Sequence, residues 1–161
     1  MGIPAAPTIN PAKLAALKEA TPRDVLRPAP DYIAPLVGWR AWKVSAKDGA
    51  WRLEALGMSG LWEPKKAMEA ACSKGNAKHP APHRDCECGI WSFPSLEALL
   101  PAIDGEYEVK VLGQVHIWGR IIECSNGSRS QFGYPKELWL FDESMEQLGY
   151  IYGVPIRTVS K

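Results

Sequence analysis

The sequence predicts an α+β domain, with a mostly antiparallel sheet or a small, partly open barrel, two or three short helices and a Pro-rich N-terminal arm. Apolar and polar residues alternate in several short segments after position 37, as they do in half-buried strands. A few other segments begin with a capping residue or a proline, as helices do. Half of the 14 prolines precede Val37, where they disfavour regular structure.

The chain is long enough for one domain with its own hydrophobic core. It has 161 residues, of which 46% are hydrophobic, and a chain of this length buries roughly 70% of its unfolded surface. Its 19 basic and 18 acidic residues leave a formal net charge of +1. This balance argues against a strongly electrostatic nucleic-acid binder, although it allows a local basic patch.

Residues 1–36 are expected to form the arm, and residues 37–161 a single α+β zinc-binding domain. One short helix fits between the prolines of the arm, because Asn10 can cap it and Pro11 can take its first position. Residues 21–35 are expected to be extended, since proline fixes φ and lacks a backbone donor.

The domain is expected to begin with a β-hairpin. Residues 39–44 and 51–56 have the composition and alternation of strands, and the Lys-Asp-Gly sequence at 47–49 is typical of a turn.

The segments that follow are expected to be two helices with a strand between them. Pro64 favours the first position of a helix over 64–72. Residues 89–93 form a short apolar strand. Ser95 can cap a helix that ends near residue 100, because Pro101 disfavours its continuation.

The last third of the chain is expected to be sheet, apart from one terminal helix. An Asn-Gly pair at 126–127 is typical of a hairpin turn, and Gly113 is expected to break the sheet before it. Asp142 can cap a helix over 143–148, which Gly149 ends. The predicted strands of this part are 106–112, 114–124, 130–134, 138–141 and 154–159.

A polar loop in the middle of the chain gathers side chains that bind metals. Cys72, His79, His83, Cys86 and Cys88 fall within 17 residues. Structural zinc takes four donors in a tetrahedron, commonly three Cys and one His. Cys72, His79, Cys86 and Cys88 supply such a set, which leaves no position open for a catalytic water. The C-x-C spacing of the last two is less common for zinc than C-x-x-C.

Other interpretations of this loop stay open. Its thiols could be partly buried without any metal. If Cys72 or His79 were not a ligand, the ion would have an open position, and Asp85 or Glu87 could act as a base. An iron–sulfur cluster would also accept three Cys and one His, but the spacing matches no ferredoxin pattern.

Catalytic signatures are missing from the sequence. It has no H-E-x-x-H, no zinc-deaminase motif, no phosphate-binding loop and no G-x-S-x-G. Cys124 is expected to be a core thiol, because a nucleophile needs an adjacent base and His116 is eight residues away along the strand. His116 itself is expected to be a hydrogen-bonded strand histidine. These observations favour a protein that is not an enzyme, without deciding the question.

Tryptophan is abundant, with seven residues, and basic side chains are interleaved with it. Such a surface could stack single-stranded bases. Strand alternation instead places tryptophan in the core and the basic side chains in water, and we favour this interpretation. The residues concerned are Arg40, Lys43, Arg52, Lys65, Lys66, Arg120 and Arg129 among Trp39, Trp42, Trp51, Trp62 and Trp118.

The segment H-P-A-P-H-R-D-C-E-C-G-I-W at 79–91 resembles a motif of a set of small bacterial and phage-encoded proteins of unassigned function, H-x-A-P-x-x-x-C-x-C-G-I-Y. The resemblance extends over about residues 36–156 and departs from the motif in having Trp91 in place of Tyr. It implies the same four site residues, leaves out His83 and implies no activity. The further matching pieces are Trp62-Glu63-Pro64, Ala70-Ala71-Cys72, 118–123, Tyr134-Pro135 and Tyr152-Gly153-Val154-Pro155.

The sequence thus predicts a non-enzymatic, zinc-stabilised binding or adaptor module with an unknown protein partner. An open-site zinc hydrolase and a single-stranded nucleic-acid binder acting through Trp and Arg are the alternatives. No segment approaches the ~20 apolar residues that span a bilayer, so no membrane partner is expected. Residues 1–10 lack the features of a secretory signal, and the cytoplasm, where thiols stay reduced, is therefore expected.

Overall fold

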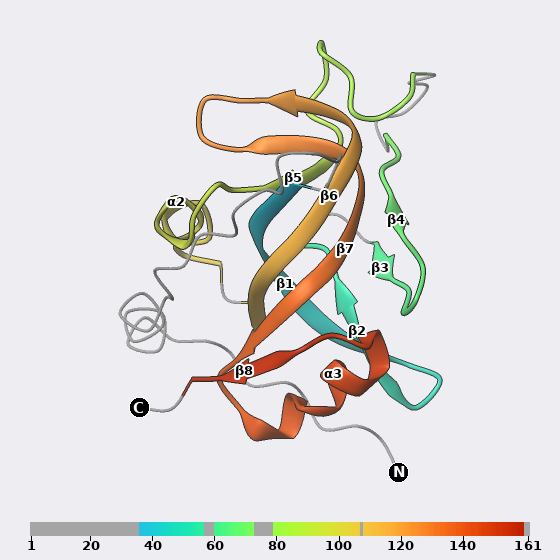
Figure 1. Cartoon of the computed structure of the whole chain (residues 1–161), viewed down its shortest axis with the longest axis vertical. Helices are drawn as coiled ribbons and strands as arrows, with labels where there is room; N and C mark the ends of the chain where they lie inside the picture. The colour runs from blue at the N-terminus through green and yellow to red at the C-terminus, as the bar shows by residue number, and fades with distance from the viewer. Residues whose placement is uncertain (1–35, 57–59, 73–78, 107, 160–161) are drawn as a thin grey trace, which may run out of the picture.

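The computed structural model describes residues 36–56, 60–72, 79–106 and 108–159. In these residues the chain forms a mixed α+β fold, with one open, mostly antiparallel sheet and two short α-helices (Figure 1). The strands are β1 (Leu36–Lys47), β2 (Ala50–Glu54), β3 (Leu61–Trp62), β4 (Met68–Glu69), β5 (Ile90–Ser92), β6 (Val111–Glu123), β7 (Ser128–Leu140) and β8 (Ile156–Thr158). The helices are α2 (Leu96–Ala102) and α3 (Gln147–Tyr152), the latter preceded by a 3₁₀ turn, η1 (Glu143–Met145). The predicted arm helix and the extended segment after it lie outside the described residues.

The order of the strands makes β7 the organising strand. The main path runs β3-β2-β1-β6-β7-β4, and β5 and β8 also pair with β7. Among the described ladders, the β7–β8 ladder alone is parallel. Because β4 and β5 both pair with β7, the segments that carry the cysteines and histidines meet beside one strand.

Both predicted hairpin turns are confirmed. The first joins β1 to β2, with Lys47 opposite Ala50 and Gly49 at a φ of 79°. The second joins β6 to β7, where Cys124 N donates to Gly127 O at 2.7 Å. The Asp-Gly turn takes positive φ at Asp48 and Gly49, as this pair favours, and the two turns set the register of the β1–β2 and β6–β7 ladders.

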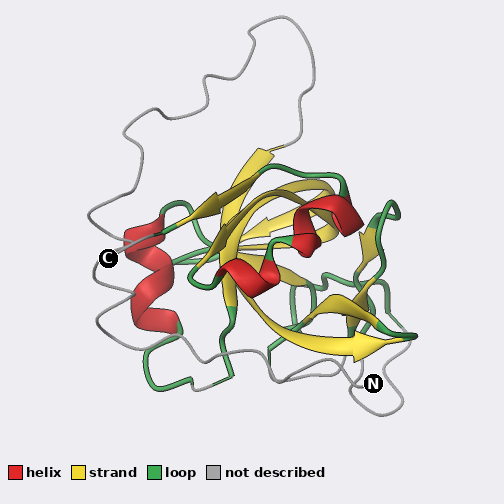
Figure 2. Cartoon of the chain, turned by 90° about the horizontal axis from the view of Figure 1, so that it is seen from below, coloured by secondary structure: helices red, strands yellow, loops and turns green. Residues whose placement is uncertain are grey.

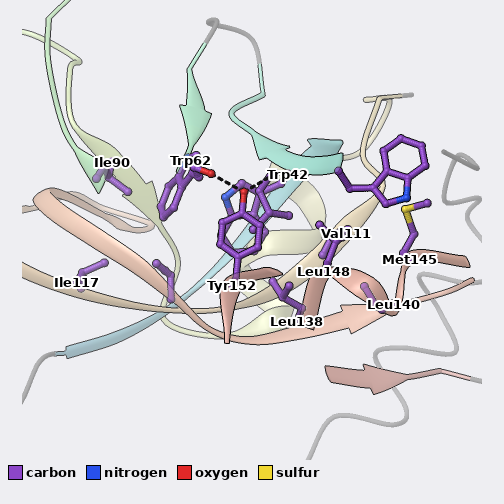
Figure 3. Close-up of a cluster of buried hydrophobic side chains, with 13 residues drawn as sticks. Trp42, Trp62, Ile90, Val111, Ile117, Leu138, Leu140, Met145, Leu148 and Tyr152 are labelled. Carbon is purple, nitrogen blue, oxygen red and sulfur yellow. Dashed lines mark hydrogen bonds between the residues drawn. The ribbon is translucent and has the colours of Figure 1, made fainter. Parts of the chain in front are cut away.

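Hydrophobic side chains fill both faces of the sheet, each beside a different helix. On one face, Trp39 and Trp139 meet edge to face, with ring centres 5.5 Å apart, and α2 contributes Leu96 and Leu99. The other face holds the larger cluster, to which α3 and the turn before it contribute (Figure 3). The helices lie at separate places against the strands (Figure 2). The buried members of the larger cluster are Trp42, Trp51, Leu53, Trp62, Ile90, Val111, Val115, Ile117, Leu138, Leu140, Met145, Leu148 and Tyr152.

Tyr152 connects the end of α3 to the far edge of the sheet. Its hydroxyl donates to Trp62 O and accepts from Leu53 N, the latter at 2.8 Å (Figure 3). Burial raises the pKa of this phenol to about 12, so the hydroxyl stays protonated and keeps its donor role.

The predicted helix over 64–72 is wrong. This segment instead forms β4 and irregular chain, and Ala70 N donates to Gln131 O on β7 at 2.8 Å. Lys65 has a φ of 59°, which no right-handed helix accommodates. Pairing with the sheet outweighs the weak local preference that Pro64 signals.

Two glycines have a different role from the predicted one. Gly113 does not break a strand but lies inside β6, where a Cβ would come within 2.3 Å of Glu137 O on β7. Gly149 does not end the last helix, which runs on to Tyr152 and ends where Gly153 takes a φ of 67°. A Cβ on Gly149 would lie 2.8 Å from the side chain of Ile156. Both glycines therefore permit close approach between elements.

The other elements in the second half of the chain are of the predicted type, but their bounds differ from those predicted. Ser95 caps α2, since its hydroxyl accepts from Ala98 N at 3.1 Å, and Pro101 lies inside the helix one residue before its end. The two strands predicted at 130–134 and 138–141 are one continuous strand, β7. Neither described helix has the length and apolar character that a bilayer crossing would require.

Candidate metal centre

Four of the five metal-binding side chains of the loop come together. Cys72 follows β4, while His79, Cys86 and Cys88 lie in the segment that leads into β5. Their ligand atoms all lie within 4.8 Å of one another, so the group could hold a metal ion. All four side chains are half-buried, as expected for ligands in a loop beside a sheet edge.

Two distances within the group match those of a tetrahedral zinc site. Cys72 Sγ lies 3.7 Å from Cys86 Sγ, and Cys88 Sγ lies 3.5 Å from His79 Nε2. Zinc bonds of about 2.3 Å to sulfur and about 2.0–2.1 Å to nitrogen give tetrahedral edges of about 3.8 Å between two sulfurs and about 3.6 Å between sulfur and nitrogen. The side chains therefore need little rearrangement to surround one ion.

Strand β7 anchors both segments that carry the ligands. Two residues before Cys72, the backbone of Ala70 is hydrogen-bonded to β7. Two residues after Cys88, β5 begins with Ile90 and pairs with the same strand. This shared anchor brings Cys72 close to ligands that follow it by up to 16 positions in the sequence.

Arg129, on β7, binds the backbone of the ligand-bearing loop. The residue is only 6% exposed, and its Nη1 donates to the carbonyl oxygens of His83, Cys86 and Cys88. The distances are 3.1 Å to His83 O and 2.9 Å to Cys88 O. Its guanidinium also lies 5.6 Å from the centre of the Trp91 ring. Arg129 thus fixes two ligand residues through their own carbonyls.

The charge of Arg129 suits an occupied site. Three thiolates, a neutral imidazole and a divalent ion sum to a formal charge of −1. A cation fixed beside this centre favours the deprotonated thiols that the metal requires. Sequence patterns place Arg129 among the basic strand residues. Its contacts to the loop were missed because no local pattern links it to a segment some 40 positions earlier.

Gly89 permits the close contact between the loop and Arg129. It has a φ of 125°, which side-chain-bearing residues rarely adopt. A Cβ there would lie 2.9 Å from Cβ of Arg129 and 3.0 Å from Cβ of Pro82. A residue other than glycine would therefore push the loop away from β7.

His83 shapes the loop but lies outside the four-residue group. Its ring lies 4.4 Å from the His79 ring, centre to centre. Its Nδ1 accepts from Asp85 N at 3.1 Å, and its carbonyl accepts from Cys86 N at 3.1 Å. These contacts close a turn between His79 and Cys86.

The two neighbouring cysteines differ in acidity. The backbone N–H of Cys88 lowers the pKa of the Cys86 thiol, whereas burial raises the pKa of Cys88. Of these two thiols, Cys86 therefore ionises at the lower pH.

The residues that an open hydrolytic site would need do not join the group. Asp85 and Glu87 are both exposed, and neither belongs to the four-residue cluster. The backbone carbonyl of Glu87 accepts from Trp91 Nε1 at 3.1 Å. This bond holds the backbone of Glu87 in place but does not position its carboxylate.

The structure corrects the expectations for the two other candidate residues. Cys124 is half-buried rather than a core thiol, and its Sγ lies 3.8 Å from Ile122 O. His116 is not the hydrogen-bonded histidine that was expected, because its buried Nδ1 has no partner among the described residues. Burial, reinforced by the nearby Lys136, lowers the pKa of His116.

We therefore expect His116 to lose its proton at a lower pH than an ordinary histidine, whose pKa is about 6.5. The measurement is an NMR titration of the imidazole resonances, with His116→Gln used to assign the signal. A midpoint for His116 at or above the ordinary value would show that its ring is accessible to water or is paired with an anion.

Most tryptophans lie in the core, as the favoured interpretation of the sequence expects, but Arg129 is buried and does not face water as that interpretation expects of the basic residues. Five of the seven are buried, namely Trp39, Trp42, Trp51, Trp62 and Trp139. Trp118 is half-buried and stacks on Phe132 with ring centres 5.8 Å apart. Most of the aromatic surface that base stacking would need is therefore used in packing.

Comparison with known proteins adds no family to these observations. No protein-family model, no curated protein and no solved structure matches this chain.

Proposed function

We propose that Cys72, His79, Cys86 and Cys88 hold one structural zinc ion, and that the chain is a zinc-stabilised, non-enzymatic binding module of the cytoplasm that recognises a protein partner. The observation that carries this proposal is the convergence of four ligand atoms within 4.8 Å. Three sulfurs and one imidazole suit zinc better than calcium or magnesium, which take oxygen ligands.

The ion would join two segments that both lead to or from strands paired with β7. One is the chain leaving β4 at Cys72, and the other is the turn that ends at Cys88 before β5. Linking them stabilises the loop without opening a coordination position, because four protein ligands complete the tetrahedron. This closed set favours a structural role over hydrolysis.

Metal analysis of the full chain, purified without a metal-affinity tag, tests the proposal. We expect one equivalent of zinc by mass spectrometry, and X-ray absorption that fits three sulfurs and one nitrogen at tetrahedral distances. Replacement by Co²⁺ should give the intense visible bands of a tetrahedral ion together with thiolate-to-cobalt charge transfer.

Two results would overturn parts of the proposal. A protein that contains no metal and has freely reactive thiols would remove the zinc. A coordination shell with a water in place of a protein ligand, combined with zinc-dependent turnover of ester or peptide substrates, would establish the hydrolase instead.

A further inference from the structure

A pocket of about 1060 Å³ lies away from the metal ligands, between the β3–β4 connection, β6, β7 and the end of α3. None of the four ligand residues lines it. Its volume is at the upper end of the ~300–1,000 Å³ typical of small-molecule sites. The pocket is therefore large enough for a small organic ligand.

The walls of the pocket are mainly apolar and aromatic. Ile117, Trp118 and Ile121 on β6 and Tyr134 on β7 are among the residues that line it. Gly119, at a φ of 80°, lies at the irregularity in the β6–β7 register that separates Trp118 from Ile121. The bulge thus leaves Trp118 and Ile121 partly exposed in the pocket rather than inside the core.

One side of the pocket is cationic, although Glu63 on the neighbouring turn interacts with Lys66 as well as with Lys47. Lys65 and Lys66 both line it, both are exposed, and neither forms an ion pair with a described carboxylate. No Asp or Glu is among the lining residues. Glu63 is bound to Lys47 at 2.7 Å. The pocket therefore complements an anion.

The lysine-bearing turn is fixed to the wall of the pocket. Lys65 N donates to the hydroxyl of Tyr134 at 2.8 Å, and that hydroxyl donates to Tyr152 O at 2.7 Å. The backbone that carries the two lysines is thus fixed by hydrogen bonds to β7 and, through Tyr134, to α3. This lowers the entropy that is lost when a ligand binds.

We infer that this pocket binds a small amphipathic carboxylate, with its apolar chain or ring against Trp118 and Ile121 and its carboxylate beside Lys65 and Lys66. The inference goes beyond the proposed recognition of a protein partner, and it does not depend on the metal. Burial of the apolar part supplies most of the affinity, and the lysines supply the preference for the anion.

Calorimetry with octanoate and its neutral analogue 1-octanol tests the inference on the full, metal-loaded chain. We expect saturable binding of one octanoate and weaker binding of 1-octanol. The double variant K65Q/K66Q should weaken octanoate binding roughly tenfold and leave 1-octanol unchanged. The control K43Q/R84Q removes the same charge from two basic residues that do not line the pocket and should bind octanoate like the parent protein.

A variant of the wall separates packing from charge. Trp118→Ala should weaken both octanoate and 1-octanol, because it removes apolar area that serves both. If this variant misfolds, the exposed lysine pair still decides the question.

Several outcomes would overturn the inference. These are no octanoate binding, equal weakening in K65Q/K66Q and K43Q/R84Q, and a dimer in sedimentation whose contact protects Trp118 from quenching. Metal content measured in the same samples keeps the two proposals distinct. If the samples contain zinc but do not bind octanoate, only the ligand inference is wrong. If they bind octanoate but contain no zinc, only the metal proposal is wrong.

Discussion

Replacing Cys86 with serine is expected to lower the zinc content of the protein from one equivalent to below a tenth and to destabilise the fold. The hydroxyl does not ionise near neutral pH and is a poor zinc ligand, so the tetrahedron loses one corner. If free zinc exceeds its dissociation constant about 1,000-fold, the lost stabilisation is about 4 kcal/mol. For a chain of this size, that corresponds to a decrease in Tm of about 8–16 °C. Calorimetric melting together with metal analysis measures both effects.

Cys124→Ser is the matched control, because it makes the same atomic change outside the ligand group. Cys124 is half-buried like the other three cysteines, and its Sγ has only a long contact to Ile122 O. This variant should keep its zinc and melt within about 1–2 °C of the parent, as surface substitutions do. A chelator should lower the Tm of the parent and of Cys124→Ser to that of Cys86→Ser, and leave Cys86→Ser unchanged. Equal melting temperatures and full zinc in Cys86→Ser would show that Cys86 is not a ligand.

The ligand group could be predicted from the sequence because its chemistry is rare and its spacing is local. Soft donors are few in this chain, which has four cysteines and three histidines, and most of them fall within one loop. The turns could be predicted for a similar reason, since Asp-Gly and Asn-Gly pairs have strong local preferences. Such signals are independent of the rest of the fold.

Features that depend on distant partners could not be predicted. The segment at 64–72 lacks any local sign of pairing with β7, and only the ladder of Met68 opposite Gly133 makes it a strand. Gly113 has the local sequence pattern of a strand break, but in the fold it lets the backbone of Glu137 approach β6 closely. In both cases the deciding partner lies more than 20 residues away, where sequence periodicity has no information.

Arg129→Met is the second substitution with a large expected effect, because it removes a donor that three carbonyls of the ligand loop share. His83 O keeps its bond from Cys86 N. Hydrogen bonds from a charged group contribute about 1.5–3 kcal/mol each, and water can replace part of this in a half-exposed loop. We therefore expect the free energy of unfolding to decrease by about 3 kcal/mol, measured by denaturant titration. Loss of a residue that supports metal ligands typically weakens metal affinity about 10–100-fold, and a zinc indicator competition measures this.

The control for this effect is Arg84→Met, which removes an exposed arginine from the same loop and should change neither quantity appreciably. Arg129→Lys keeps the charge but loses the extended guanidinium, so its zinc affinity should lie between those of the parent and Arg129→Met.

A double-mutant cycle between Arg129→Met and Cys86→Ser separates support of the metal from support of the sheet. If Arg129 acts by holding Cys86 and Cys88 in place for the ion, much of its stabilising effect is already lost once the site is broken. The two substitutions should then cost clearly less together than the sum of their separate costs. Additive costs would mean that Arg129 stabilises β7 and its packing on Trp91 independently of zinc. In that case the ligand loop would owe its geometry to the β5–β7 ladder and to Gly89 rather than to the buried cation.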